Sequence, residues 1–135
     1  MADINDVYEF LKKEAPTYFL ATDDNGQPRV RPFGTIDLFE GHLYIQTGKK
    51  KDVYKQIVAN PKVEICGWKG ADWLRVSGEL VPDERVEAKK HMLDAYPNLR
   101  SMYDENDDNT AVLYFRNGTA RFASMSGKPA ETVEL

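Results

Sequence analysis

Positive side chains gather where the chain passes from a predicted strand, 42–47, into a predicted helix, 50–59. The junction carries a hydroxyl, a glycine and three lysines: Thr47, Gly48, Lys49, Lys50 and Lys51. A helix N-terminus has free N–H groups and the positive end of the helix dipole, so it attracts phosphate. Lysines are unfavourable there unless an anion compensates them. The junction therefore predicts a phosphate site, although a solvated lysine run has the same appearance.

A predicted strand over residues 29–38 carries a second group of candidates. Side chains alternate between the two faces of a strand, and one face here is apolar, which predicts a core face. That face consists of Val30, Pro32, Ile36 and Leu38. The opposite face has the cationic, aromatic and hydroxyl groups that a flat anionic cofactor would use: Arg29, Arg31, Phe33 and Thr35. Because proline cannot donate to a ladder, Pro32 predicts an edge or a bulge. A solvated face with two incidental arginines fits the pattern equally well.

A tryptophan on a polar strand face is the third candidate. In the predicted strand 72–81, the apolar alternation of Leu74, Val76 and Leu80 directs Trp73 to the opposite face. An exposed indole favours a cover, which could be a flat ring or a partner subunit. A simple cap at the end of a barrel is the alternative.

Other chemistry has little support in the sequence. The net charge of −4 disfavours nucleic-acid binding, and no run approaches the roughly 20 apolar residues that span a membrane. His42 and His91 belong to no metal-binding spacing, so no metal site is expected. Cys66 is the only cysteine, so an internal disulfide is impossible, and with no recognisable signal peptide the chain is expected to be cytoplasmic.

The elements that would position these candidates are mostly short strands. Ile4, Val7, Tyr8 and Leu11 have helical spacing, and Asp3 is the expected N-cap. Another helix is expected over 84–96. The remaining predicted strands are 17–22, 62–67, 111–116 and 119–125, the last two forming a hairpin around Asn117-Gly118. The acidic run 104–108 is expected to be a solvated loop, and 127–135 a loosely ordered tail. This pattern predicts one domain over 1–135, an antiparallel barrel with peripheral helices.

With these residues in view, the chain resembles the pyridoxamine 5′-phosphate oxidase-like family of FMN-binding split barrels. It is most similar to the small members grouped with nitroimidazole-resistance and general stress proteins. The segments that carry the resemblance are 17–22, 26–32, 43–51, 60–63 and 74–80. The resemblance implies a mainly β (α+β) fold, a six- to seven-stranded antiparallel split β-barrel with peripheral helices. It also implies a homodimer that holds FMN at the subunit interface.

The resemblance also implies roles for individual residues. Arg31, Pro32 and Phe33 would lie along the ring and phosphate region, and Trp73 would reach the flavin from a neighbouring strand or across the dimer. The candidates for cofactor binding are Arg29, Arg31, Pro32, Phe33, Thr47, Lys49, Lys50, Lys51 and Trp73. Since Gly48 and the three lysines replace the oxidases' Ser-Arg-Lys motif, the lysine that holds the phosphate stays open.

The implied activity is that of an FMN-dependent oxidoreductase with a small-molecule redox substrate, without a dedicated protein nucleophile or acid–base pair. A non-catalytic flavin-binding or sensing module, or a barrel that binds haem or a deazaflavin, are the alternatives. Residues 129–135 lack the basic substrate-binding segment of the oxidases, so oxidation of pyridoxamine phosphate is not expected. The histidine of some nitroimidazole-resistance proteins is also missing, so that activity has no support.

Overall fold

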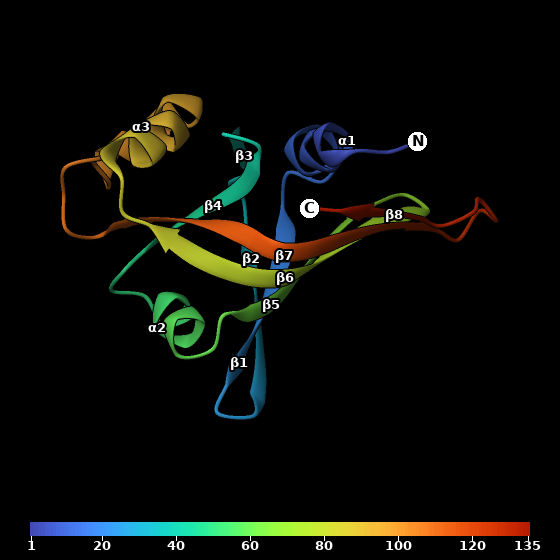
Figure 1. Cartoon of the computed structure of the whole chain (residues 1–135), viewed down its shortest axis with the longest axis horizontal. Coiled ribbons are helices and arrows are strands. Elements are labelled where there is room, and N and C mark those ends of the chain that lie inside the picture. Colours follow the sequence, from blue (N-terminus) through green and yellow to red (C-terminus); the bar gives the residue numbers. More distant parts are fainter.

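The computed structural model describes residues 1–135 as one antiparallel sheet with helices at its periphery (Figure 1). The strands are β1 (Tyr18–Asp24), β2 (Gln27–Phe33), β3 (Asp37–Phe39), β4 (His42–Gly48), β5 (Lys62–Lys69), β6 (Asp72–Asp83), β7 (Thr110–Ser124) and β8 (Glu131–Glu134). The helical segments are α1 (Ile4–Glu9), η1 (Phe10–Glu14), α2 (Asp52–Ala59), α3 (Val86–Ala95) and η2 (Pro97–Ser101). None of the helices has both the length and the apolar character that crossing a membrane requires.

The sheet is open rather than closed. Its strands follow the order β2-β1-β5-β6-β7-β4-β3, and β8 pairs with β7. The predicted mainly β, antiparallel split-barrel fold is therefore confirmed. The core is built from apolar side chains on the inner faces of the strands, among them Leu20, Ile45, Ile65, Leu74, Val76, Leu113 and Phe115. The predicted core face of β6 is part of it.

The N-terminal helix begins where the sequence predicts. The Asp3 side chain accepts hydrogen bonds from the N–H groups of Asn5 and Asp6, and Asp6 accepts from the Asp3 N–H. This capping box satisfies donors that would otherwise be orphaned at a helix start. Val7 and Leu11 are then buried one turn apart, at 0% and 1% exposure, so α1 and η1 pack against the main core.

The predicted strand 29–38 is wrong as a single element, because the chain leaves the sheet after β2 and re-enters it as β3. Tyrosines from elsewhere hold the link between the two strands. The Tyr18 hydroxyl donates to the Thr35 carbonyl, and the Ile36 N–H donates to the Tyr96 hydroxyl at 3.1 Å. These tertiary contacts, which local sequence does not encode, decide where the strand ends.

The predicted core face of this stretch is also wrong over β2. β2 is an edge strand, and its pairing with β1 sets its faces, with Arg31 opposite the buried Leu20. The side chains on that inner side are Arg29, Arg31 and Phe33. Val30 and Pro32 point outward instead, and Val30 is 67% exposed. Only the part beyond the break reaches the core, as at Ile36, which is 1% exposed.

The predicted hairpin around Asn117-Gly118 is a bulge within a continuous strand. β7 runs through this dipeptide, and its register against β6 shifts between Ser77 and Glu79. A Cβ on Gly78 would lie 2.9 Å from the Gly118 Cα, so the two backbones meet where only glycine fits. The Asn–Gly pair thus bends a long strand rather than reversing the chain.

The C-terminal segment is more ordered than the sequence indicated. Residues expected to form a loosely ordered tail contain β8, which pairs antiparallel with β7 in the register Thr119↔Glu134 to Phe122↔Glu131. Val133 is 7% exposed within the main core. The alternating apolar residues Val133 and Leu135 were the sequence signal for this strand.

Candidate functional site

A pocket of about 290 Å³ lies where β2, β4 and η2 approach one another. Three parts of the chain line it: the end of β2 with the link that follows, the end of β4 with the start of α2, and the residues around η2. The lining residues are Pro32, Phe33, Gly34, Thr35, Gln46, Thr47, Lys51, Leu99, Met102 and Tyr103. Several of the predicted cofactor residues therefore meet in one place.

The Thr47 hydroxyl has no hydrogen-bond partner. Thr47 is only 3% exposed, and its Oγ1 is the one buried side-chain nitrogen or oxygen in the molecule that nothing satisfies. Leaving such a group unpaired costs about 1–3 kcal/mol, so native structures avoid it. Because Thr47 lines the pocket, a ligand there could supply the missing partner.

The N-terminus of α2 lies at the same pocket as this hydroxyl. Lys51 is the N-cap residue and gives no side-chain cap, so the first N–H groups of the helix lack a side-chain acceptor. The Lys51 side chain itself lines the pocket. A Cβ on Gly48 would lie 3.1 Å from both the Tyr103 hydroxyl and Asn109 Nδ2, so glycine allows these side chains to approach the turn. Together these groups suit a phosphate.

The two arginines of β2 have hydrogen-bond and ion-pair partners within the chain. Arg31 donates to the Leu20 carbonyl at 3.1 Å and to Thr22 Oγ1 at 2.8 Å, and its other terminal nitrogen donates to Gln56 Oε1 at 2.7 Å. Burial, followed by the nearby Arg29, lowers the pKa of Arg31. Arg31 therefore ties β2 to β1 and α2, and it does not line the pocket.

Arg29 is a surface residue. Its Nε forms an ion pair with Asp24 at 3.2 Å, and just over half of its side chain is exposed. Like Arg31, it lies outside the pocket lining.

The three lysines of the junction separate in the structure. Lys49 forms a 2.6 Å ion pair with Glu84, and this hydrogen bond raises the pKa of the lysine. Lys50 is exposed, and only its backbone is held, by a hydrogen bond from its N–H to Asn109 Oδ1. Lys51 alone lines the pocket.

Trp73 lies on the outward face of β6, away from the pocket of its own chain. It stands opposite Trp68 of β5 and Ala123 of β7 in the sheet register. Trp68 is 66% exposed and Trp73 is partly exposed, so this pair has no cover within the chain. The prediction of an indole on an uncovered face agrees with this placement.

The structure thus unites Pro32, Phe33, Thr47 and Lys51 and separates the other candidates. Sequence reasoning missed the third wall of the pocket, formed by Leu99, Met102 and Tyr103. These apolar and aromatic residues follow α3 in an otherwise polar stretch, which was the only available signal. Pairing of β4 with β7 brings this stretch to Thr47, since Gly48 lies opposite Thr110.

Larger hollows exist but offer less to a ligand. One of about 430 Å³ lies between Phe10 and the C-terminal segment, where its charged residues Asp72 and Lys128 already face each other at 3.6 Å. A polar hollow of about 320 Å³ contains Asp83, which is held by Tyr44 and Arg85. Neither contains an unsatisfied buried group, so we favour the pocket around Thr47.

Comparisons with solved structures find one protein with a similar sequence and fold and others that are similar in fold. A NimC/NimA family protein from Clostridium acetobutylicum is 43% identical, with a TM-score of 0.91 over 97% of this chain and 91% of that chain. A haem-binding protein from Mycobacterium smegmatis is 14% identical, with a TM-score of 0.73 over 94% of this chain and 56% of that chain. A pyridoxamine 5′-phosphate oxidase-related, FMN-binding protein from Nostoc punctiforme is 18% identical, with a TM-score of 0.67 over 89% and 80%.

The family comparison covers most of the chain. No curated protein matches it significantly. The sequence profile described as pyridoxamine 5′-phosphate oxidase matches residues 4–122, a range that includes every predicted cofactor residue. The chain therefore belongs to the pyridoxamine 5′-phosphate oxidase-like family.

Proposed function

We propose that this protein is a cytoplasmic flavoprotein that binds FMN as a homodimer and acts as an oxidoreductase on a small-molecule substrate. The observation that carries the proposal is the buried, unsatisfied Thr47 hydroxyl beside Lys51 and the α2 N-terminus. A phosphate monoester accepts hydrogen bonds from donors of these kinds: a hydroxyl, an ammonium group and free backbone N–H groups.

In this proposal each part of the pocket has a distinct task. Thr47 and Lys51 hold the phosphate, and Lys51 is preferred over Lys49 because Glu84 already pairs with the latter. Pro32 and Phe33 provide apolar surface for the ring. FMN, when bound, supplies the redox chemistry, while the chain supplies binding, orientation and electrostatics. In this proposal no protein nucleophile or acid–base pair takes part, and the pocket lining contains no histidine, cysteine or carboxylate.

FMN is favoured over haem by the positions of the two histidines. A similar protein binds haem and another binds FMN, so both cofactors occur on this fold. Here His91 Nδ1 is 2.6 Å from Asp37 Oδ2, and His42 is exposed beside the Glu40 carbonyl. Neither histidine lines the pocket, so neither is placed to ligate an iron there.

A second copy of the chain would complete the site. At about 290 Å³ the pocket is just below the roughly 300–1,000 Å³ typical of ligand sites, so one chain encloses only part of a flavin. The outward face of β1, β2 and β5 exposes Phe19 (49%), Val30 (67%) and Trp68 (66%). Apolar surface of this kind marks interfaces. In a dimer through this face, Trp73 would be available to the flavin of the partner copy.

The test is the visible spectrum of the purified protein, with mass identification of any released ligand. We expect flavin bands and a released mass equal to that of FMN. A Soret band, or a colourless protein that takes up no FMN on titration, would refute the proposal.

Two further measurements separate the parts of the proposal. Sedimentation of the FMN complex should give twice the mass of one chain, and a monomer with bound FMN would remove the dimer. Oxidation of NADH or NADPH by the yellow protein distinguishes an oxidoreductase from a module that only stores or senses flavin. No turnover with any electron donor would favour the storage or sensing function.

A further inference from the structure

We propose that Tyr103 completes the phosphate subsite of this pocket with its hydroxyl group, and that Asp107 positions it. This inference rests on the proposed FMN function. It adds a ligand that the sequence did not indicate, and it assigns a task to the acidic run that follows Tyr103.

The Tyr103 hydroxyl also lacks a hydrogen-bond partner in the chain, but unlike Thr47 Oγ1 its oxygen is accessible. Tyr103 is only 9% exposed and lines the pocket. Its backbone N–H donates to the Leu99 carbonyl at 2.9 Å, but its hydroxyl makes no hydrogen bond within the chain. The pocket therefore contains two hydroxyls without a partner in the chain, one buried and one accessible, and a single acceptor bound there would accept from both.

The position of the hydroxyl assigns it to the phosphate rather than to the ring. A Cβ on Gly48 would lie 3.1 Å from the Tyr103 oxygen and 3.2 Å from its Cε1, so the phenol lies against the turn between Thr47 and Lys51. A phosphate placed in this corner would accept from both hydroxyls and from the lysine. A phosphate monoester has three terminal oxygens, and these three groups supply donors from separate parts of the chain.

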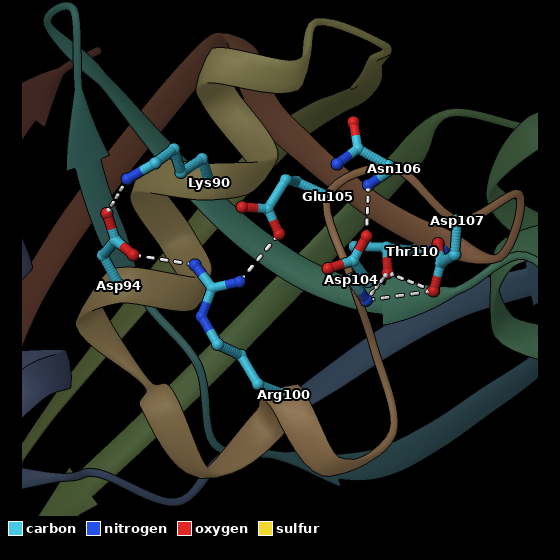
Figure 2. A network of polar contacts seen from close by, with 8 residues as sticks. All are labelled: Lys90, Asp94, Arg100, Asp104, Glu105, Asn106, Asp107 and Thr110. Atoms are coloured by element: carbon cyan, nitrogen blue, oxygen red, sulfur yellow. Dashed lines mark hydrogen bonds and ion pairs between the residues drawn. The ribbon is translucent and has the colours of Figure 1, made fainter.

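Asp107 organises the loop that follows Tyr103 (Figure 2). One carboxylate oxygen accepts from the N–H groups of Asn109 at 3.0 Å and Thr110 at 2.7 Å. The other accepts from the Thr110 hydroxyl at 3.0 Å and from the Asp104 N–H at 3.1 Å. Burial alone would raise the pKa of Asp107, but these hydrogen bonds outweigh it and lower the pKa. The predicted solvated loop is confirmed as a loop, with Asp104 and Asp108 exposed, and this network orders it.

This network holds both chain segments that flank the proposed phosphate position, the one with Tyr103 and the one with the lysines. Asp107 holds the N–H of Asp104, the residue next to Tyr103, and that of Asn109 at the far end of the loop. Asn109 accepts from the Lys49 N–H at 2.7 Å through its carbonyl and from the Lys50 N–H at 3.1 Å through Oδ1. Asp107 is thus a positioning residue, because it acts through Tyr103 and the lysine turn without lining the pocket.

The direct test compares FMN with riboflavin, which has the same ring and no phosphate. For Tyr103→Phe we expect the dissociation constant for FMN to rise about fivefold to tenfold, the effect of one lost hydrogen bond. The constant for riboflavin should stay within about twofold. The matched control is Tyr114→Phe, since Tyr114 is a partly buried tyrosine of β7 outside this pocket. It should change neither constant.

The outcomes separate this inference from the function on which it rests. Unchanged FMN affinity in Tyr103→Phe, or an equal loss for FMN and riboflavin, would overturn the subsite while the FMN function stands. If the unaltered protein bound no FMN, the proposed function and the subsite would fall together. Thermal unfolding of each variant verifies that it is folded before titration.

Asp107 is tested by a double-mutant cycle. Asp107→Asn should weaken FMN binding about threefold to tenfold, and its effect should be smaller in the Tyr103→Phe background because the part that acts through the tyrosine hydroxyl is already lost there. Asp108→Asn is the matched control, since Asp108 is exposed and makes no hydrogen bond or ion pair. Independent, additive losses from Asp107→Asn and Tyr103→Phe would show that Asp107 does not act through Tyr103.

Discussion

Two segments carry clustered positive side chains: the arginines of β2 and the turn from Thr47 to Lys51. They differ in whether their polar groups have partners within the chain. The guanidinium of Arg31 has protein acceptors on both terminal nitrogens, and Arg29 has its own carboxylate. The turn leaves a buried hydroxyl and a helix N-terminus without side-chain partners. The difference teaches that a binding site is marked by hydrogen-bonding capacity that the protein does not use, rather than by charge alone.

Replacing Arg31 gives the largest expected effect and tests the first half of this comparison. Arg31→Ala would leave the Leu20 carbonyl and Gln56 Oε1 without this donor. We expect the free energy of unfolding to fall by about 3 kcal/mol, measured by urea denaturation. FMN affinity of the folded variant should change less than threefold by the same reasoning. Normal stability with a large loss of FMN affinity would place Arg31 in the cofactor site instead.

Lys51→Ala tests the second half. Removal of a charge-assisted hydrogen bond to phosphate should weaken FMN binding by about 2 kcal/mol, roughly a thirtyfold rise in dissociation constant by fluorescence titration. Stability should stay within about 0.5 kcal/mol, since the Lys51 side chain forms no ion pair in the chain. Lys50→Ala is the control and should have little effect. A larger effect of Lys50→Ala would reassign the phosphate to that lysine.

Thr47→Val should affect folding and binding in opposite directions. Valine keeps the shape of the side chain but removes the unsatisfied hydroxyl, so the free protein should gain about 0.5–1 kcal/mol of stability. FMN binding should weaken by about 1 kcal/mol because the phosphate loses a donor. Calorimetric unfolding and FMN titration measure the two quantities. A destabilised free protein would mean that the hydroxyl already has a partner, and would remove the main argument for the site.

The smallest expected effect is on the pH dependence of stability, through Asp107. Like Arg31, the Asp107 carboxylate has hydrogen-bond partners within the chain on both of its terminal atoms. Because the pKa of Asp107 is lowered in the folded state, its contribution to stability is complete above its unfolded pKa of about 3.9. The contribution is lost as the pH falls through the lower folded value. The melting temperature should therefore fall less steeply below about pH 4 in Asp107→Asn than in the unaltered protein. Identical slopes would indicate that Asp107 titrates normally.

Local sequence patterns were sufficient for some of this molecule. Helical spacing and the Asp3 cap predicted the N-terminal helix, and alternation predicted the buried face of β6 through Leu74 and Val76. The strand–glycine–helix junction was predicted as a phosphate site, and two of its residues, Thr47 and Lys51, line the pocket. In each case the signal lies within a few residues of the feature that it predicts.

The misses depend on contacts between distant parts of the chain. The break between β2 and β3 depends on the hydroxyls of Tyr18 and Tyr96. Asn117-Gly118 has the composition of a turn, yet the backbone of Gly78 makes it a bulge. Tyr103 reaches the pocket only because β4 pairs with β7. No window of sequence contains both members of these pairs.

A crystal structure of the protein with FMN tests the central claim most directly. We expect the phosphate within hydrogen-bonding distance of the Thr47 hydroxyl and the Lys51 ammonium group, with the ring against Phe33. A phosphate bound instead by Arg29 or Arg31, or crystals grown with excess FMN in which the corner beside Thr47 holds only water, would contradict it.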